Sequence, residues 1–71
     1  MKYVIKDPKV CHGKPVFKGT RIMVWQVLEM LAAGEKVNDI LKSYPSLTKE
    51  MIEEALSYAA EILKGEHAKS P

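Results

Sequence analysis

Cys11, His12 and His67 are the residues of this chain best suited to nucleophilic, acid–base or metal chemistry. Cys11 and His12 are neighbours, so from an extended backbone their side chains would point in different directions. A Cys–His nucleophile also needs a third group to orient the pair, and the sequence places none nearby. No CxxC or HxxxH spacing joins these residues into a metal site. The sequence therefore predicts no catalytic residue, no metal and no cofactor, with Cys11 semi-buried and His12 at the surface or in a cap.

A second candidate is the basic, glycine-containing stretch from Gly13 to Ile22. A phosphate-binding P-loop needs Lys and then Ser or Thr after its second glycine, whereas Gly19 is followed by Thr20 and Arg21, so a nucleotide loop is excluded. The residues instead predict a turn, a short strand at 16–17 and a second turn, with positive φ at both glycines. Three cations in this stretch could neutralise nucleic-acid phosphates: Lys14, Lys18 and Arg21. The alternative is that they are ordinary solvated side chains beside a structural turn.

The charge of the chain is unevenly divided. The net charge is +2, but residues 1–22 carry six Lys or Arg against one acidic residue, and residues 23–71 carry five against eight. This distribution indicates a basic arm on an acidic body. A lone cysteine suits a reducing compartment, and the sequence shows neither a targeting segment nor an apolar run of about 18 residues. We therefore expect a cytoplasmic protein without a membrane partner.

Helical periodicity begins after the arm. Apolar residues at helical spacing predict helices over 23–33, 37–44 and 49–63, which end at Gly34, Pro45 and Gly65. Thr48 is the expected N-cap of the third helix. The chain is then one domain over 1–71, with a basic β arm at 1–22, a three-helix core at 23–64 and a loose tail at 65–71. The predicted fold class is mainly α, a three-helix helix-turn-helix plan with short N-terminal β-strands.

The third helix combines an apolar stripe with acidic flanks. The stripe is expected to face inward and comprises Met51, Ile52, Ala55, Leu56, Ala59, Ile62 and Leu63. The flanks hold Glu50, Glu53, Glu54 and Glu61 against Lys49 and Lys64, a balance that would repel phosphate along much of the helix. If DNA is bound, the basic arm must therefore supply most of the attraction. The exposed edge of the third helix near Thr48, Lys49 and Ser57 is then expected to approach the bases.

Self-association is the expected supplement to the thin core of a chain this small. Trp25 and Met30 lie largely off the apolar stripe of the first helix, so they either close the core or form a dimer face. Residues 2–6 predict an edge strand that pairs within one protomer or between two. Tyr3 and Ile5 on this strand are therefore further candidates for a dimer or partner interface.

Several motifs, taken together in their order and spacing, resemble one known family. They cover about residues 5–59 and are Asp7-Pro8, Gly13-Lys14-Pro15, Gly19-Thr20-Arg21-Ile22 followed by Val24-Trp25, Ala33-Gly34, Ile40-Leu41, Tyr44-Pro45-Ser46-Leu47-Thr48 and Ala55-Leu56. With them, the chain resembles the small prokaryotic domain-of-unknown-function family number four-hundred-thirty-three, which is treated as antitoxin-like. One departure is Lys36-Val37, where a capping residue followed by proline or an acidic residue would be expected at the start of the second helix.

The resemblance implies a homeodomain-like or winged-helix-like domain, a homodimer and a PIN-like toxin nuclease as partner. It carries over no catalytic residue. On this basis we expect the antitoxin half of a toxin–antitoxin pair, which binds its toxin and its own promoter DNA. The alternative is a protein-interaction module that does not bind DNA.

Overall fold

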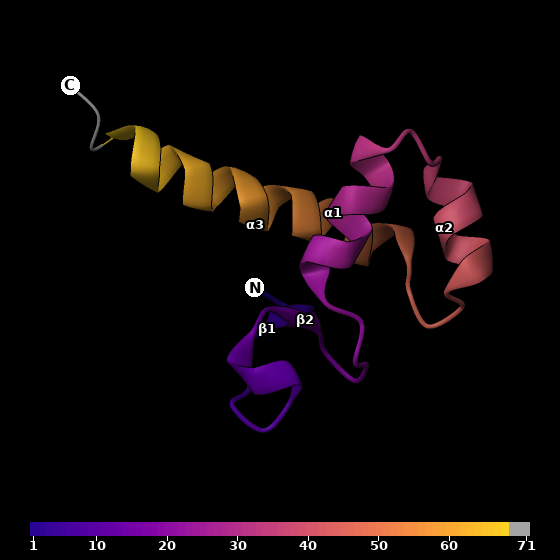
Figure 1. Cartoon of the computed structure of the whole chain (residues 1–71), viewed down its shortest axis with the longest axis horizontal. Helices are drawn as coiled ribbons and strands as arrows, with labels where there is room; N and C mark the ends of the chain where they lie inside the picture. Colours follow the sequence, from indigo (N-terminus) through magenta and orange to yellow (C-terminus); the bar gives the residue numbers. More distant parts are fainter. Residues whose placement is uncertain (69–71) are drawn as a thin grey trace.

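The chain folds into a mainly α domain with a small N-terminal sheet (Figure 1). In this computed structural model the backbone is described for residues 1–68 and the side chains for residues 1–65. The elements in chain order are β1 (Val4–Ile5), a short 3-10 turn η1 (Cys11–Gly13), β2 (Val16–Phe17), α1 (Val24–Ala32), α2 (Val37–Ser43) and α3 (Lys49–Ala68). The predicted fold class is confirmed: three helices follow a short antiparallel sheet, and a tight turn joins α2 to α3.

The N-terminal strand pairs within its own chain. β1 runs antiparallel to β2, with Val4 opposite Phe17 and Ile5 opposite Val16. The backbone after β2 bends back at once, so that Val16 also forms a bridge with Met23 just before α1. β1 is shorter than the strand predicted over residues 2–6. One of its two edges is hydrogen-bonded to β2.

The helix boundaries follow the local signals in the sequence. Gly34 has φ +94° and ends α1 as predicted, because a left-handed residue stops the helical backbone. The Thr48 hydroxyl accepts a hydrogen bond from the Met51 amide at 3.2 Å and caps α3. α2 begins at Val37 with no side-chain cap from Lys36, in keeping with the missing capping residue there.

The core lies where β2 and the first half of α3 meet α1 and α2. Its most deeply buried side chains, all exposed by 1% or less, are Val16, Phe17, Val27, Ile40, Ile52 and Ala55. They come from every strand and helix except β1, which contributes Val4 to the same cluster. Since burying an apolar side chain fully is worth about 1.5–3 kcal/mol, the arm is held to the helices largely by Phe17 and Val4.

Two expectations for the third helix are wrong. Leu56, Ile62 and Leu63 were predicted to face the core, but their side chains are 48%, 47% and 62% exposed. Ile62 and Leu63 lie on the second half of the helix, which projects from the body (Figure 1). Leu56 lies in the first half, but it is turned about 100° from the fully buried Ala55. The helix also continues through Gly65 to Ala68, because Gly65 does not adopt positive φ and no proline follows it there. Residues 69–71 of the expected tail lie outside the described part of the chain.

Alanine substitution at Gly34 and at Gly65 tests where α1 and α3 end. Gly65→Ala should raise the free energy of unfolding by up to about 1 kcal/mol, since Gly65 has helical φ and open space around its Cα. Gly34→Ala should lower it by about 1–2 kcal/mol, because an alanine is strained at φ +94°. Urea denaturation of both variants measures the two signs. Destabilisation by Gly65→Ala would mean that the helix ends at Gly65 after all.

Candidate binding surfaces

The basic turn after β2 is held by hydrogen bonds from one side chain. The Thr20 hydroxyl donates to the Phe17 carbonyl at 2.7 Å and accepts from the Ile22 amide at 3.0 Å. The backbone adds two more bonds, from the Thr20 amide to Phe17 and from the Phe17 amide to Ile22. Gly19, between them, has φ +79° as predicted. This turn presents two of the expected phosphate-binding cations, Lys18 and Arg21, both of which are exposed.

The Cys11–His12 pair adopts a backbone that the sequence did not indicate. Both residues have positive φ, +50° and +58°, so the segment is a left-handed turn rather than extended. The half-buried Cys11 thiol donates to the Arg21 carbonyl at 3.6 Å and thereby connects this turn to the basic turn. His12 is exposed. Among residues whose placement is described, no group of three His, Cys, Asp or Glu side chains is arranged to hold a metal ion.

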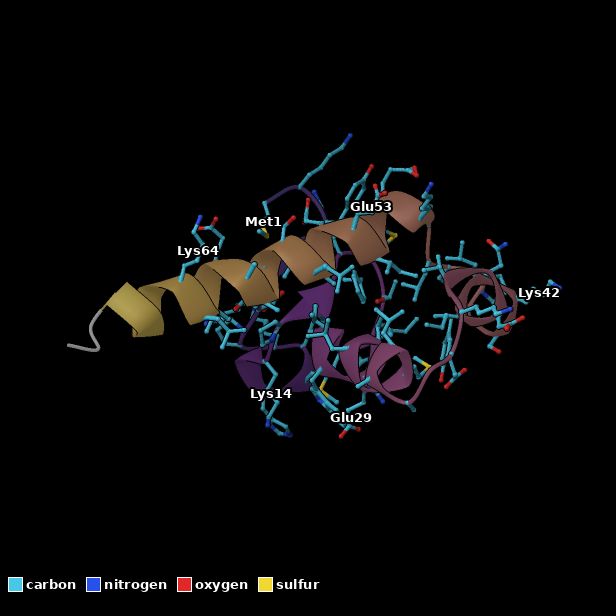
Figure 2. The ribbon with its side chains drawn as sticks, turned by 90° about the horizontal axis from the view of Figure 1, so that it is seen from above. Met1, Lys14, Glu29, Lys42, Glu53 and Lys64 are labelled. Atoms are coloured by element: carbon cyan, nitrogen blue, oxygen red, sulfur yellow. The ribbon has the colours of Figure 1, made fainter. Side chains whose placement is uncertain are left out.

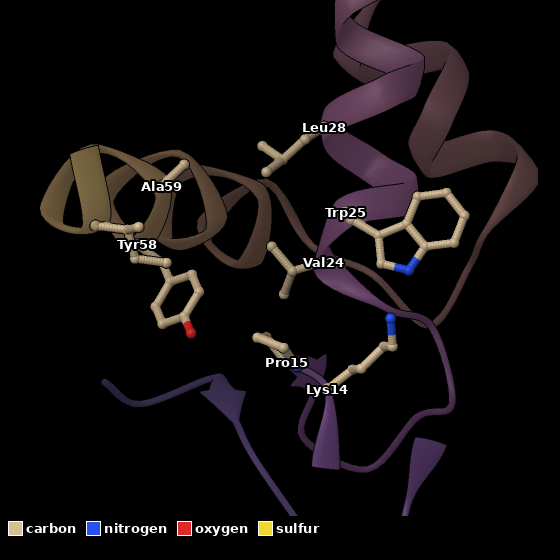
Figure 3. A pocket seen from close by; sticks show the side chains of 8 residues that line it. Lys14, Pro15, Val24, Trp25, Leu28, Tyr58 and Ala59 are labelled. Carbon is tan, nitrogen blue, oxygen red and sulfur yellow. The ribbon is translucent and has the colours of Figure 1, made fainter. Parts of the chain in front are cut away.

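An apolar groove of about 430 Å³ opens between α1, the second half of α3 and the arm (Figure 3). One wall comes from α1, the other from α3, and the arm closes one end with Pro15. The lining residues are Lys14, Pro15, Val24, Trp25, Leu28, Tyr58, Ala59 and Ile62. Trp25 is 47% exposed, so the predicted dimer candidate lies on an open surface and not in the core. Lys14, predicted to bind phosphate, is instead brought to the same groove as Trp25.

The other interface candidates are less accessible. Met30 is half-buried and packs against the core, although it also lines a shallow hollow with Trp25 and the carboxylates Glu29 and Glu35. Tyr3 is half-buried against the core as well. Of the four candidates, Trp25 therefore offers the largest free surface; Ile5 is half-buried and lines a separate hollow beside Arg21.

The start of α3 does not share a face with Lys14. Lys49 and Glu53 are four residues apart and so lie on one side of the helix, where Glu50 and Glu53 are exposed. In Figure 2, Glu53 and Lys14 project to opposite sides of the molecule. The Thr48 hydroxyl is engaged in capping. The predicted nucleic-acid residues thus fall on three separate places: the groove, the basic turn and the start of α3.

Glu54 is the polar residue whose role the sequence did not reveal. The sequence places it among four glutamates on the acidic flanks of the helix, but it is half-buried and accepts three backbone hydrogen bonds from the N-terminal segment. The Lys2 amide donates to Oε1 at 3.0 Å, and the Tyr3 and Val4 amides donate to Oε2 at 2.6 and 2.5 Å. Its position one turn after the buried Met51 places it at the edge of the apolar stripe, where a carboxylate needs a partner.

These contacts lower the pKa of Glu54. Burial, the largest single influence, pushes the pKa up, but the amides of Val4, Tyr3 and Lys2 and the N-terminal ammonium together outweigh it. The pKa of the carboxyl is therefore held below its ordinary value of 4.5. Because the folded pKa is below the unfolded one, the contact stabilises the fold above about pH 4.5, and this stabilisation is lost as the pH falls through the folded pKa.

Replacing Glu54 should remove part of the acid sensitivity of the fold. In Glu54→Gln, one oxygen becomes an NH₂ donor that faces backbone N–H groups, so the β1 amides should exchange hydrogen faster at about pH 7. The loss of stability between about pH 7 and about pH 3 should be smaller than in the wild type, with Glu53→Gln, its exposed neighbour, as control. Equal acid destabilisation of wild type and Glu54→Gln in urea titrations would contradict this role.

The hydroxyl of Thr20 gives a second test. Thr20→Val keeps the shape of the side chain and removes both hydroxyl hydrogen bonds, which should lower the free energy of unfolding by about 1–2 kcal/mol. Thr20→Ser retains the hydroxyl and should cost less than about 0.5 kcal/mol. Chemical denaturation compares the two, and a valine variant as stable as the serine variant would show that the hydroxyl does not hold the turn.

No helix within residues 1–68 is both long and apolar enough to cross a membrane.

Comparison with known proteins places most of the chain in one family. Residues 4–59 match the family model described as Protein of unknown function (DUF433). An uncharacterized protein, y4eO, of Sinorhizobium fredii is 41% identical over 63 residues, which cover 87% of this chain and 28% of that protein. The chain thus spans little more than a quarter of this relative, and no solved structure matches it. The arm from Val4 onwards, the basic turn and the helices up to Ala59 all lie in the matched region, and the chain belongs to the DUF433 family.

Proposed function

We propose that this chain is an antitoxin-like binding protein with no chemistry of its own. It acts in the cytoplasm as a homodimer that covers a PIN-like nuclease and contacts the promoter DNA of its own genes. The observation that carries the DNA part is the hydrogen-bonded turn that holds Lys18 and Arg21 exposed beside a helix-turn-helix core. Because the backbone of this turn is already ordered, less conformational entropy is lost when its two cations bind phosphate.

The arm, rather than α3, supplies the attraction to DNA in this proposal. Glu50 and Glu53 are exposed at the start of α3 and oppose phosphate there, so Lys49 is at most a secondary contact. The Thr48 hydroxyl already accepts a hydrogen bond from Met51 and has limited capacity to read a base. Lysine and arginine contacts to phosphate fix position and affinity without reading sequence.

A second function is favoured by the same acidic face. Exposed carboxylates at the start of α3, together with an open apolar groove, suit contact with a basic protein surface. A protein-interaction module of this kind would neutralise a nuclease without binding DNA. Co-purification with the product of a neighbouring gene, unaffected by nuclease treatment and without promoter binding, favours this function.

Fluorescence anisotropy with DNA from directly upstream of the gene, against scrambled DNA over a salt series, tests the first proposal. Lys18→Glu and Arg21→Glu should each abolish binding at moderate salt, since each removes a cation and adds a charge that repels phosphate. Milder Lys18→Gln and Arg21→Gln variants should each flatten the salt slope by about 0.9.

Lys64→Glu, on the second half of α3 (Figure 2), makes the same charge change outside the basic turn and should bind as the wild type does. Thermal unfolding checks that each variant is folded. Wild-type affinity in both glutamate variants would refute the arm as the DNA contact, and the absence of any preference for promoter DNA would favour the interaction module.

A further inference from the structure

We propose that a second copy of this chain occupies the apolar groove, with the projecting half of its α3 laid against α1. The inference deepens the homodimer of the proposed function by naming its surface. It assigns the interface to Trp25 and Leu28 on α1 and to Tyr58, Ala59 and Ile62 on α3, all of which line the groove.

The first argument is the continuity of the α3 stripe. Met51, Ile52 and Ala55 are 6%, 1% and 0% exposed and form the core in the first half of the helix. Ala59 and Ile62 continue that face at the spacing of three to four residues, but beyond the reach of α1 and the arm. Ile62 is therefore 47% exposed although it lies on the core-facing side. A helix face that is apolar in both halves and covered in only one lacks a partner for the other half.

The second argument is self-complementarity. The same chain carries both the groove and the projecting helix that borders it, so two copies can exchange these features about a two-fold axis, as an isologous dimer requires. Figure 3 shows the groove open between α1 and α3, with Val24 and Leu28 directed from α1 toward α3, Tyr58 on the α3 side and the Trp25 ring at the outer rim of α1. Leu63 on the projecting half is 62% exposed but points about 100° away from Ile62 and does not line the groove.

Charge and area agree with a second copy as the occupant. The groove is lined by one charged residue, Lys14, and the net charge of +2 gives little repulsion between two chains. A standard interface buries about 800 Å² on each partner, roughly 15% of the 5233 Å² that the described chain exposes. Of its large exposed apolar residues, Trp25 and Ile62 line the groove. A volume of about 430 Å³ also falls in the range of small-ligand sites, so a small apolar ligand is the competing occupant.

Sedimentation equilibrium of the full chain over a concentration series tests the interface. Ile62→Glu should raise the dimer dissociation constant at least about tenfold, because it places a carboxylate in an apolar contact. Leu56→Glu is the matched control: Leu56 is 48% exposed on the same helix, but six residues earlier it points about 120° away and does not line the groove. It should change the constant by less than about twofold. A wild type that stays monomeric, or an Ile62→Glu variant that dimerises as the wild type does, overturns the proposal.

The single tryptophan gives an independent readout of the same surface. Trp25 emission should shift to longer wavelength on dilution, with a midpoint at the dissociation constant from sedimentation. A dimer whose dissociation leaves Trp25 emission unchanged would place the interface elsewhere and overturn the assignment. Circular dichroism shows whether Ile62→Glu keeps its helices.

Failure of this proposal and failure of the DNA proposal are distinguishable. A loss of dimerisation in Ile62→Glu leaves the basic turn in place, so the monomer should still bind DNA weakly with a salt dependence. DNA binding that is absent in the wild type, with the dimer intact, would refute the promoter contact alone.

Discussion

The carboxylate of Glu54 is the polar contact that joins the start of the arm to α3, beside the buried Val4 and Phe17. It accepts hydrogen bonds from three successive backbone amides, at Lys2, Tyr3 and Val4, and so attaches the start of the chain to α3. β1 in turn pairs with β2, and β2 leads directly into the Gly19–Thr20 turn. Two paired strands of this length are not stable in isolation, so the sheet needs contacts from the helices to stay folded. The exposed cations are therefore placed by three contacts together: the Glu54 carboxylate at the start of the arm, the buried Val4 and Phe17, and the Thr20 hydroxyl in the turn itself.

α3 serves two structural roles along its length. Its first half completes the core against α1, α2 and the arm, and its second half extends past them with the same apolar face. In the described part of the chain, Ile62 and Leu63 on the second half of this twenty-residue helix remain 47% and 62% exposed. The uncovered portion borders the groove, and this division separates the apolar surface from the acidic start of the helix and from the basic turn. In the proposed function, protein and DNA therefore contact different surfaces of this domain.

Much of the fold could be predicted because its signals are local. Helical periodicity located α1, α2 and the start of α3, while Gly34 and Thr48 marked boundaries through their own backbone and side-chain chemistry. Gly65 shows the limit of such signals. A glycine near the end of an apolar stripe resembles a helix stop, but whether it takes positive φ depends on the residues that follow and on the energy of continuing the helix. The left-handed backbone at Cys11 and His12 likewise has no counterpart in their residue types.

The sequence by itself determined the fold class, the order of the elements, the division of charge and the family. These follow from residue type and near-neighbour spacing, which act within one or two turns of a helix or along one strand. Only the tertiary structure decided that Glu54 binds the N-terminal backbone, that Lys14 lies beside Trp25 and that Ile62 is open to solvent. Each of these depends on segments about 10 to 50 residues apart in the chain, or on where a covering element ends. A periodic stripe specifies which face of a helix is apolar, but the length of its neighbours decides how much of that face is buried.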